Sequence, residues 1–299
     1  MKPIFKDDAA RTKMLDWYER CRSKLSVATE SRTVATQFGD THVLVGGPAT
    51  APPLVMVHGA MASSAHMAVE LEPMFASHHV YCIDVIGQSP KTPHQRPSVK
   101  NNEYGIWLAE VLDGLSLSRV PLVAVSWGGF AAIRLAAHAP ERIEKLALLV
   151  PAGLVNGHAW QGITKMMWPM MMWRMFPSDA RFAKFAQSLL TTLDDDWLPY
   201  LHDAFRSFNM DMRVPKLATP EELARLTAPV LVIAGDQDYS FPGDKAIARA
   251  KQLFPTLTAT ELVENCKHCP PTTPQFRQWL SSRIQSFVRQ PDNAAAAAS

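Results

Sequence analysis

In Val123-Ala124-Val125-Ser126-Trp127-Gly128-Gly129, the most informative stretch of the sequence, an apolar run ends at a serine and small residues follow soon after it. A serine hydroxyl becomes a useful nucleophile when it protrudes from the backbone within reach of a base, and a sharp strand-to-helix turn provides this. Such a turn brings strand and helix together, so the residues two before and two after the serine must be small. Here they are Ala124 and Gly128. The stretch predicts a nucleophile elbow at Ser126.

Two candidate strands downstream of this serine end in polar residues. The first covers residues 229–234 and is followed by Gly235-Asp236-Gln237-Asp238, which places two acids at the carboxyl end of a strand. The second covers residues 257–264 and precedes His268, the single histidine after Asp238 in the sequence. The region downstream of the serine therefore offers two candidate acids and one candidate base.

A third candidate strand lies upstream. Residues 54–57 are apolar and run into His58-Gly59-Ala60-Met61, and a further acid stands in Asp84-Val85-Ile86-Gly87-Gln88-Ser89. Through these stretches, the serine turn and Lys267-His268, residues 31–290 resemble the alpha/beta-hydrolase superfamily. Within it the chain is most similar to the bacterial carboxylesterases and C–C bond hydrolases that have a plain H-G-x loop. It departs from the family pattern at Ala124, where glycine is usual, and at Lys267, which also replaces a usual glycine.

The resemblance implies a catalytic role for three side chains. Family members carry serine, acid and histidine in that order along the chain, which assigns Ser126 as nucleophile and His268 as base. Of the two acids, the family pattern G-x-x-D favours Asp238 as the one that orients the histidine, and we expect Asp236 to cap or brace the loop; Asp236 is the alternative acid.

The resemblance also implies an oxyanion hole made of two backbone N–H groups. We expect those of Trp127 and Ala60, and Met61 is the alternative to Ala60 because sequence does not fix loop geometry. In this family the histidine of the H-G-x loop usually braces the loop, so we do not expect His58 to transfer protons.

The fold class expected is α/β, with a mostly parallel central sheet flanked by helices and an inserted helical cap. The elements alternate as such a sheet requires. We expect an N-terminal helical extension at 1–30, a core at 31–153 and 227–290, a helical cap at 154–226 and a tail at 291–299. The expected strands are 32–36, 42–45, 54–57, 80–84, 121–126, 146–150, 230–235 and 257–263, and the clearest expected helices are 10–26, 104–115, 127–139 and 275–289.

The expected cap begins with an unusual cluster of methionine and tryptophan at residues 160–176. Methionine is flexible and polarizable, so such a surface suits a pocket for varied apolar groups. The candidate pocket residues are Met61, Met167 and Met171. We do not expect membrane association, because Pro169 should break the helix and because Lys165 and Arg174 interrupt its apolar face.

Composition and the absence of certain sequence patterns argue against several kinds of partner and cofactor. The 299 residues are 47% hydrophobic, and 30 Lys and Arg against 28 Asp and Glu leave a net charge of +2, so we expect no nucleic-acid partner. There is no apolar run of membrane-spanning length and no signal-peptide pattern at the N-terminus, which predicts a cytoplasmic protein. A homodimer is compatible with the sequence. Cys266 and Cys269 lack the second ligand pair of a zinc site, so we expect no metal and no cofactor.

The function expected is a serine hydrolase that cleaves carboxylic esters with an apolar moiety through an acyl-enzyme intermediate, with a small-molecule ester as its partner. A C–C bond hydrolase and a cofactor-free haloperoxidase are alternatives, because both use the same three side chains. A non-catalytic hydrolase-like ligand-binding protein is the alternative from another class.

Overall fold

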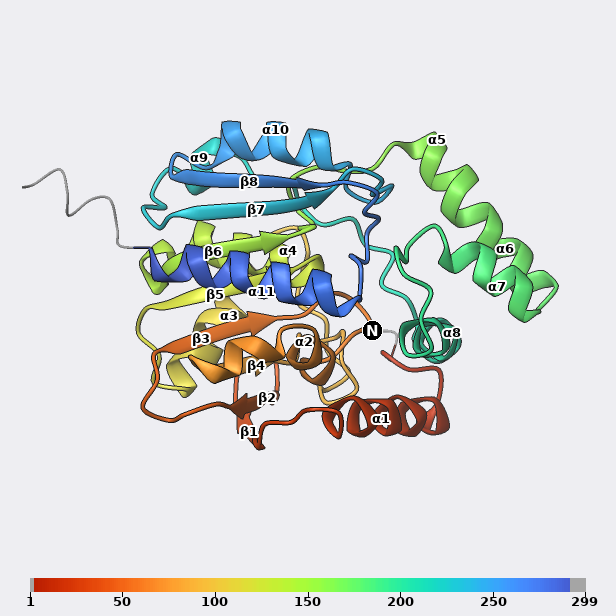
Figure 1. The fold of residues 1–299 in the computed structure, drawn as a ribbon, viewed down its shortest axis with the longest axis horizontal. Helices are drawn as coiled ribbons and strands as arrows, with labels where there is room; N and C mark the ends of the chain where they lie inside the picture. The colour runs from red at the N-terminus through yellow and green to blue at the C-terminus, as the bar shows by residue number, and fades with distance from the viewer. Residues whose placement is uncertain (1–2, 291–299) are drawn as a thin grey trace, which may run out of the picture.

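The computed structural model describes residues 3–290, and within them eight strands form one sheet (Figure 1). The order across the sheet is β1-β2-β4-β3-β5-β6-β7-β8; β1, β2 and β4 pair antiparallel, and all other neighbours pair parallel. This is the mostly parallel α/β sheet that the alternating pattern predicts. The strands are β1 (Thr29–Val34), β2 (Thr41–Gly46), β3 (Pro53–Val57), β4 (His79–Ile83), β5 (Val120–Val125), β6 (Ile143–Leu149), β7 (Val230–Gly235) and β8 (Leu257–Val263).

Helices cover both faces of this sheet and extend beyond its carboxyl edge (Figure 1). The α-helices are α1 (Asp8–Arg22), α2 (Ser64–Glu70), α3 (Glu103–Gly114), α4 (Trp127–His138), α5 (Ala159–Gln161), α6 (Trp168–Met175), α7 (Asp179–Ala186), α8 (Trp197–Ser207), α9 (Pro220–Leu223), α10 (Gly243–Leu253) and α11 (Pro274–Arg289). Short 3₁₀ segments cover Glu72–Ala76 and Pro140–Arg142, and a π-helical segment covers Gly162–Met167.

Side chains along the inner strands alternate between two hydrophobic cores. In β3, Val55 and Val57 belong to the core shared with α3, α4 and α10, whereas Leu54 and Met56 belong to the core shared with α2 and α11. This period of two follows from the pleat of a strand, and a sheet buried on both faces needs apolar residues in both registers. Because both faces of the sheet are apolar, polar side chains from several parallel strands can meet only beyond the strand ends, and ligands in such folds bind at the carboxyl edge.

A long insertion, residues 150–229, separates β6 from β7 and carries α5–α9. In Figure 1, α5–α8 lie beyond the carboxyl ends of the strands. The expectation that Pro169 breaks the helix here is wrong, because helical turns continue from α5 through the π-helical segment into α6. Pro169 stands in the first turn of α6, directly after the wide π turn, where its missing N–H and its ring are tolerated.

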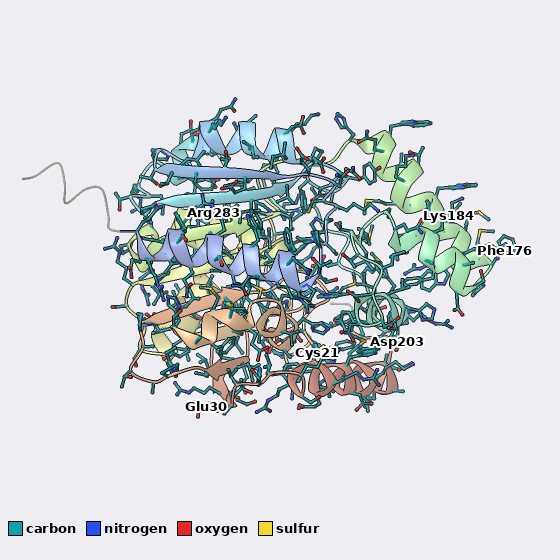
Figure 2. The ribbon with its side chains drawn as sticks, viewed as in Figure 1. Cys21, Glu30, Phe176, Lys184, Asp203 and Arg283 are labelled. Atoms are coloured by element: carbon teal, nitrogen blue, oxygen red, sulfur yellow. The ribbon has the colours of Figure 1, made fainter. Side chains whose placement is uncertain are left out.

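The N-terminal segment packs against this insertion. Phe5 forms an isolated antiparallel bridge with Phe208, and their rings lie 4.5 Å apart. The indole N–H of Trp17 in α1 donates to Asp203 of α8 at 2.9 Å, and Figure 2 shows Asp203 on the side of α8 that faces α1. A third hydrophobic cluster, with residues from α1, α6, α7 and α8, joins the two segments. The chain's beginning thus helps to hold the insertion over the sheet.

The expected strand and helix positions agree with these elements to within a few residues. The expected domain boundaries stay predictions, and the expected tail at 291–299 lies outside the described residues. Among the helices at residues 3–290, none combines the length and hydropathy needed to cross a bilayer.

Gly128 tests the expectation that the residue two after Ser126 must be small. A Cβ at this position would lie 2.4 Å from the carbonyl oxygen of Val57 and 2.6 Å from that of His58. We expect Gly128→Ala to lower the free energy of unfolding by about 2–3 kcal/mol, measured by urea denaturation, because backbone atoms cannot move aside as a flexible side chain would.

Gly162→Ala is the matched control, since a Cβ there meets no atom within 4 Å. Its free energy of unfolding should stay within about 1 kcal/mol of the unsubstituted protein. Equal losses of unfolding free energy in the two variants would show that the nearby backbone oxygens are not what requires glycine at position 128.

Candidate active site

Ser126 occupies a strained turn between β5 and α4. Its backbone has φ 50° and ψ −111°, a region that residues with a side chain rarely adopt. Its N–H donates to Leu149 at 3.0 Å, and its carbonyl accepts from the N–H groups of Phe130 at 3.1 Å and Ala152 at 3.0 Å. Such strain persists only where the surroundings fix the backbone, and it commonly marks functional positions. The turn presents the serine hydroxyl at the carboxyl edge of the sheet, as the sequence predicts for a nucleophile elbow.

The structure brings Ser126, His268 and Asp238 into contact. The Oγ of Ser126 lies 2.9 Å from Nε2 of His268, and Nδ1 of His268 lies 2.8 Å from Oδ2 of Asp238. The other carboxylate oxygen of Asp238 accepts from the N–H groups of Ser240 at 2.7 Å and Phe241 at 3.1 Å. Because an ionised carboxylate only accepts, Nδ1 of His268 carries the proton, and Nε2 is left to accept from the serine hydroxyl.

The electrostatics around His268 favour its protonated form. Burial alone lowers the pKa of this imidazole, but the charge of Asp238 and its hydrogen bond outweigh burial, so the pKa of His268 lies above its ordinary value of 6.5. A raised pKa strengthens the imidazole as an acceptor for the serine proton.

The second acid and the two cysteines have other partners. Asp236 accepts from the N–H of Cys266 at 2.9 Å and so braces the loop before His268, while Asp238 contacts the imidazole. Burial raises the pKa of Cys266 and of Cys269 to about 12, so both thiols are protonated near neutral pH and are poor nucleophiles. No cluster of three metal-binding side chains is found within residues 3–290.

His58 has both ring nitrogens occupied by the backbone. Its Nε2 accepts from the N–H of Val85 at 2.9 Å, so its proton is on Nδ1, which donates to the carbonyl of Gly59 at 2.6 Å. In the trans peptide that follows Gly59, the N–H of Ala60 points opposite to this carbonyl. His58 therefore fixes the direction of the Ala60 N–H and has no nitrogen free to exchange protons with a substrate.

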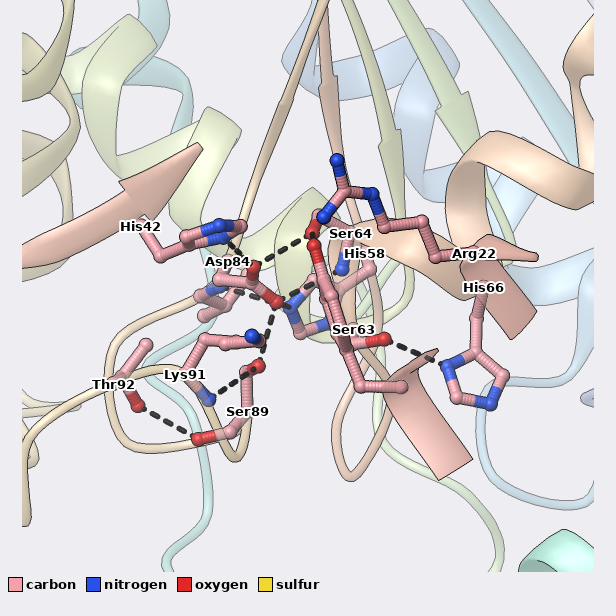
Figure 3. Close-up of polar contacts among 12 residues, drawn as sticks. Arg22, His42, His58, Ser63, Ser64, His66, Asp84, Ser89, Lys91 and Thr92 are labelled. Carbon is pink, nitrogen blue, oxygen red and sulfur yellow. Dashed lines mark hydrogen bonds and ion pairs between the residues drawn. The ribbon is translucent and has the colours of Figure 1, made fainter. Parts of the chain in front are cut away.

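A buried carboxylate holds this loop from behind (Figure 3). Asp84 accepts from His42 at 2.7 Å, from the N–H and hydroxyl of Ser64 at 2.8 and 2.6 Å, and from the hydroxyl of Ser89 at 2.6 Å. Burial alone raises the pKa of Asp84, but the hydrogen bond from His42 and the nearby ring of His58, 3.5 Å away, outweigh burial, so the pKa lies well below the ordinary range. A fully buried charge is stable only with such a complete set of donors. The network joins β2, β4 and the start of α2 beneath the loop at His58.

A cavity of about 350 Å³ opens beside Ser126 and His268. Most of its lining is apolar and comes from the loop after β3, from α2, from the insertion and from α11. The main apolar contributors are Met61, Met67, Leu71, Met166, Met167, Met170, Phe185, Leu189, Leu201, Phe205, Met210, Met212, Phe276 and Leu280. A cavity of this size accommodates a small apolar ligand.

Two of the three candidate pocket residues line the cavity, and the third does not. Met61 and Met167 line the cavity, although Met167 is also 53% exposed, whereas Met171, 42% exposed, is not among the lining residues. Met166 and Met170, one helical turn apart, line the cavity instead, and the exposed face of the helix carries Met171. The methionine cluster pointed to the correct helical segment, but it did not show which of its residues face the cavity.

Sequence reasoning missed the lining residues of α7 and α8. Phe185, Leu201 and Phe205 reach the cavity from these helices. An apolar periodicity was present at 197–207, but it indicates only a buried face and not what that face contacts. The two expected oxyanion donors lie at the site: Trp127 is the first residue of α4, whose N–H lacks an intrahelical acceptor, and Ala60 lines the cavity.

Residues 54–276 match the model of the alpha/beta hydrolase family. The chain is 27% identical over 260 residues to an uncharacterized carboxylesterase, nap, of Bacillus subtilis, covering 84% of each chain. It is 25% identical over 286 residues to the carboxylesterase YbfK of the same organism, covering 91% of this chain and 92% of the relative. The crystal structure of naproxen esterase from Bacillus subtilis superposes with a TM-score of 0.77 at 22% identity, covering 92% and 97% of the two chains.

The charge of Asp238 should account for the raised pKa of His268. Asp238→Asn removes that charge and leaves the burial, so we expect the pKa of His268 to fall below 6.5, as followed by NMR titration of the imidazole. Asp236→Asn is the control, since Asp236 bonds Cys266 and not the imidazole. An unchanged pKa of His268 in Asp238→Asn would contradict this assignment.

Proposed function

We propose, since this chain belongs to the alpha/beta hydrolase family, that it is a serine hydrolase which cleaves carboxylic esters with an apolar moiety through an acyl-enzyme intermediate. The observation that carries the proposal is the contact of Ser126, His268 and Asp238 beside an apolar cavity that Ser126 and His268 line. The two carboxylesterase relatives, matched over most of their length, support ester cleavage as the reaction.

The first half of the reaction acylates the serine. Ser126 Oγ attacks the ester carbonyl while Nε2 of His268 takes its proton, and Asp238 stabilises the imidazolium that forms. The imidazolium then gives this proton to the leaving alcohol as the C–O bond breaks. Water deacylates the serine by the same route in reverse, so that the acid is released and Ser126 regains its proton.

Backbone donors stabilise the negative charge that develops on the carbonyl oxygen. We assign this role to the N–H groups of Trp127 and Ala60, with Met61 as the alternative to Ala60. Trp127 has the position for it because the first N–H groups of a helix have no intrahelical partner and carry its positive dipole end. Ala60 has the orientation for it because His58 holds the preceding carbonyl on the opposite side of the peptide.

The cavity selects for an apolar group on the substrate. Its wall is formed mainly by methionine, leucine and phenylalanine side chains, so each methylene that it buries adds about 0.8 kcal/mol. Methionine-rich walls adapt to differently shaped groups. A small-molecule ester is thus the proposed partner; the expectations of no nucleic-acid partner and of a cytoplasmic location stay predictions.

A panel of p-nitrophenyl esters together with a fluorophosphonate tests the proposal. We expect the protein to turn over esters of longer apolar acids with a higher kcat/KM than the acetate, and to form one covalent phosphonyl adduct on the peptide that contains Ser126. Ser126→Ala should lose the adduct and lower kcat by at least about 10³-fold, while its thermal unfolding stays close to that of the unsubstituted protein.

Two outcomes would contradict the proposal. A folded protein that forms no adduct and hydrolyses no ester would be a hydrolase-like ligand-binding protein. Turnover of a vinylogous diketone at a kcat/KM well above that of every ester would identify a C–C bond hydrolase, because ester turnover alone is common in this fold.

A further inference from the structure

The loop that carries His268 has no regular secondary structure of its own. It joins β8 to α11, and Asn265 within it has a φ of 52°. Buried backbone groups in such a loop need partners from elsewhere in the fold. On the side of β7, Asp236 accepts from the N–H of Cys266, and the N–H of Gln237 donates to the carbonyl of Cys266, both at 2.9 Å. These bonds fix the loop before His268 and leave the residues on either side of the imidazole to be held by another segment.

A single hydroxyl from the insertion bridges the two residues that flank His268. The N–H of Lys267 donates to Oγ1 of Thr191 at 2.8 Å, and the same hydroxyl donates to the carbonyl of Cys269 at 2.7 Å. The hydroxyl thus accepts one bond and donates one. Because Lys267 precedes His268 and Cys269 follows it, the hydroxyl ties together the peptide groups that lie one residue further out on each side of His268.

The backbone around Thr191 reinforces this bridge. The N–H of Cys269 donates to the carbonyl of Leu189 at 2.8 Å, and the N–H of Thr191 donates to the carbonyl of Cys269 at 3.1 Å. Leu190 and Cys269 form an isolated parallel bridge. The segment 189–191 therefore lies along the loop like a short added strand, and Leu189 also lines the cavity beside Ser126.

We propose that Thr191 is a positioning residue for His268: its hydroxyl sets the loop so that Nε2 of the imidazole stays within hydrogen-bond distance of Ser126. The inference rests on the proposed function of Ser126 and His268. It also makes the insertion part of the proton-transfer machinery as well as a wall of the cavity, because the insertion and the base share these hydrogen bonds.

The physical reason is that proton transfer between Ser126 and His268 is sensitive to small displacements of the imidazole. The imidazole has to meet Ser126 at 2.9 Å and Asp238 at 2.8 Å together, and a displacement of about 1 Å can cost about 100-fold in rate. Without the Thr191 hydroxyl, the N–H of Lys267 faces a methyl group and lacks an acceptor. The loop then has to move or admit water, and the imidazole moves with it.

The experiment compares Thr191→Val, Thr191→Ser and Thr192→Val. Valine keeps the shape of threonine without its hydroxyl, and serine keeps the hydroxyl without the methyl. We expect Thr191→Val to lower kcat on a p-nitrophenyl ester by about 10- to 100-fold with KM within about twofold, and to slow fluorophosphonate labelling of Ser126 by a similar factor. Thr191→Ser should restore both rates to within about threefold.

Thr192→Val is the matched control for losing a hydroxyl one residue further on. The hydroxyl of Thr192 accepts a longer bond, 3.3 Å, from the N–H of Thr272, whereas the bonds to Lys267 and Cys269 are made by Thr191. We expect its kcat within about twofold of the unsubstituted protein. The pH profile of kcat/KM adds a measurement that a loss of stability would not change. Weaker contact of His268 with Asp238 lowers the pKa of His268, so the acidic limb of the profile of Thr191→Val should shift to lower pH.

The outcomes separate the inference from the proposed function. Equal rates for Thr191→Val and Thr192→Val, or equal impairment of Thr191→Ser and Thr191→Val, would overturn the positioning role while labelling of the unsubstituted protein upheld the serine chemistry. If the unsubstituted protein neither hydrolysed esters nor became labelled, the proposed function would be overturned, and the inference with it.

Discussion

The strained backbone of Ser126 is the constraint on which the rest of the site depends. A φ of 50° with a side chain present is unfavourable by about 1–3 kcal/mol, so the surroundings have to enforce it. They do so through backbone bonds to Leu149, Phe130 and Ala152, and through glycines that allow neighbouring backbone to approach, Gly59 and Gly128. The cost is offset by the packing of β5 and α4 in the core. In return the hydroxyl stands clear of its own strand and faces the imidazole.

The parallel sheet explains how residues so distant in sequence reach this hydroxyl. The loops after β3, β5, β7 and β8 all leave the same edge of the sheet, and they supply Ala60, Ser126, Asp238 and His268 respectively. Polar contacts then fix these loops. His58, above the buried Asp84, fixes the loop after β3, and the hydrogen bonds that Asp238 accepts from backbone N–H groups fix the loop after β7. Asp236, together with Thr191 of the insertion, fixes the loop after β8. Rigid support of this kind is what preorganised catalysis requires.

The sequence predicted those parts of the molecule that local patterns determine. An apolar run located β7, a second strand candidate located β8, and small residues around Ser126 located the turn, because such patterns arise from short-range sterics. Contacts made only in the folded chain could not be predicted from the sequence, because the pairing of Phe5 with Phe208 and the bridge made by Thr191 leave no periodic pattern in it. Met171 was chosen in place of Met170 because a dense methionine cluster does not show which of its residues face inward. Pro169 was misjudged because a π turn precedes it and places it in the first turn of α6.

A crystal structure of the protein after reaction with an alkyl fluorophosphonate would show whether Ser126, the backbone donors and the cavity act together on one substrate. We expect phosphorus bonded to Oγ of Ser126, the phosphoryl oxygen about 2.7–3.1 Å from the backbone nitrogens of Trp127 and of Ala60 or Met61, and the alkyl chain in the cavity against Met166 and Met170. A phosphoryl oxygen directed into solvent, or an alkyl chain outside the cavity, would contradict it.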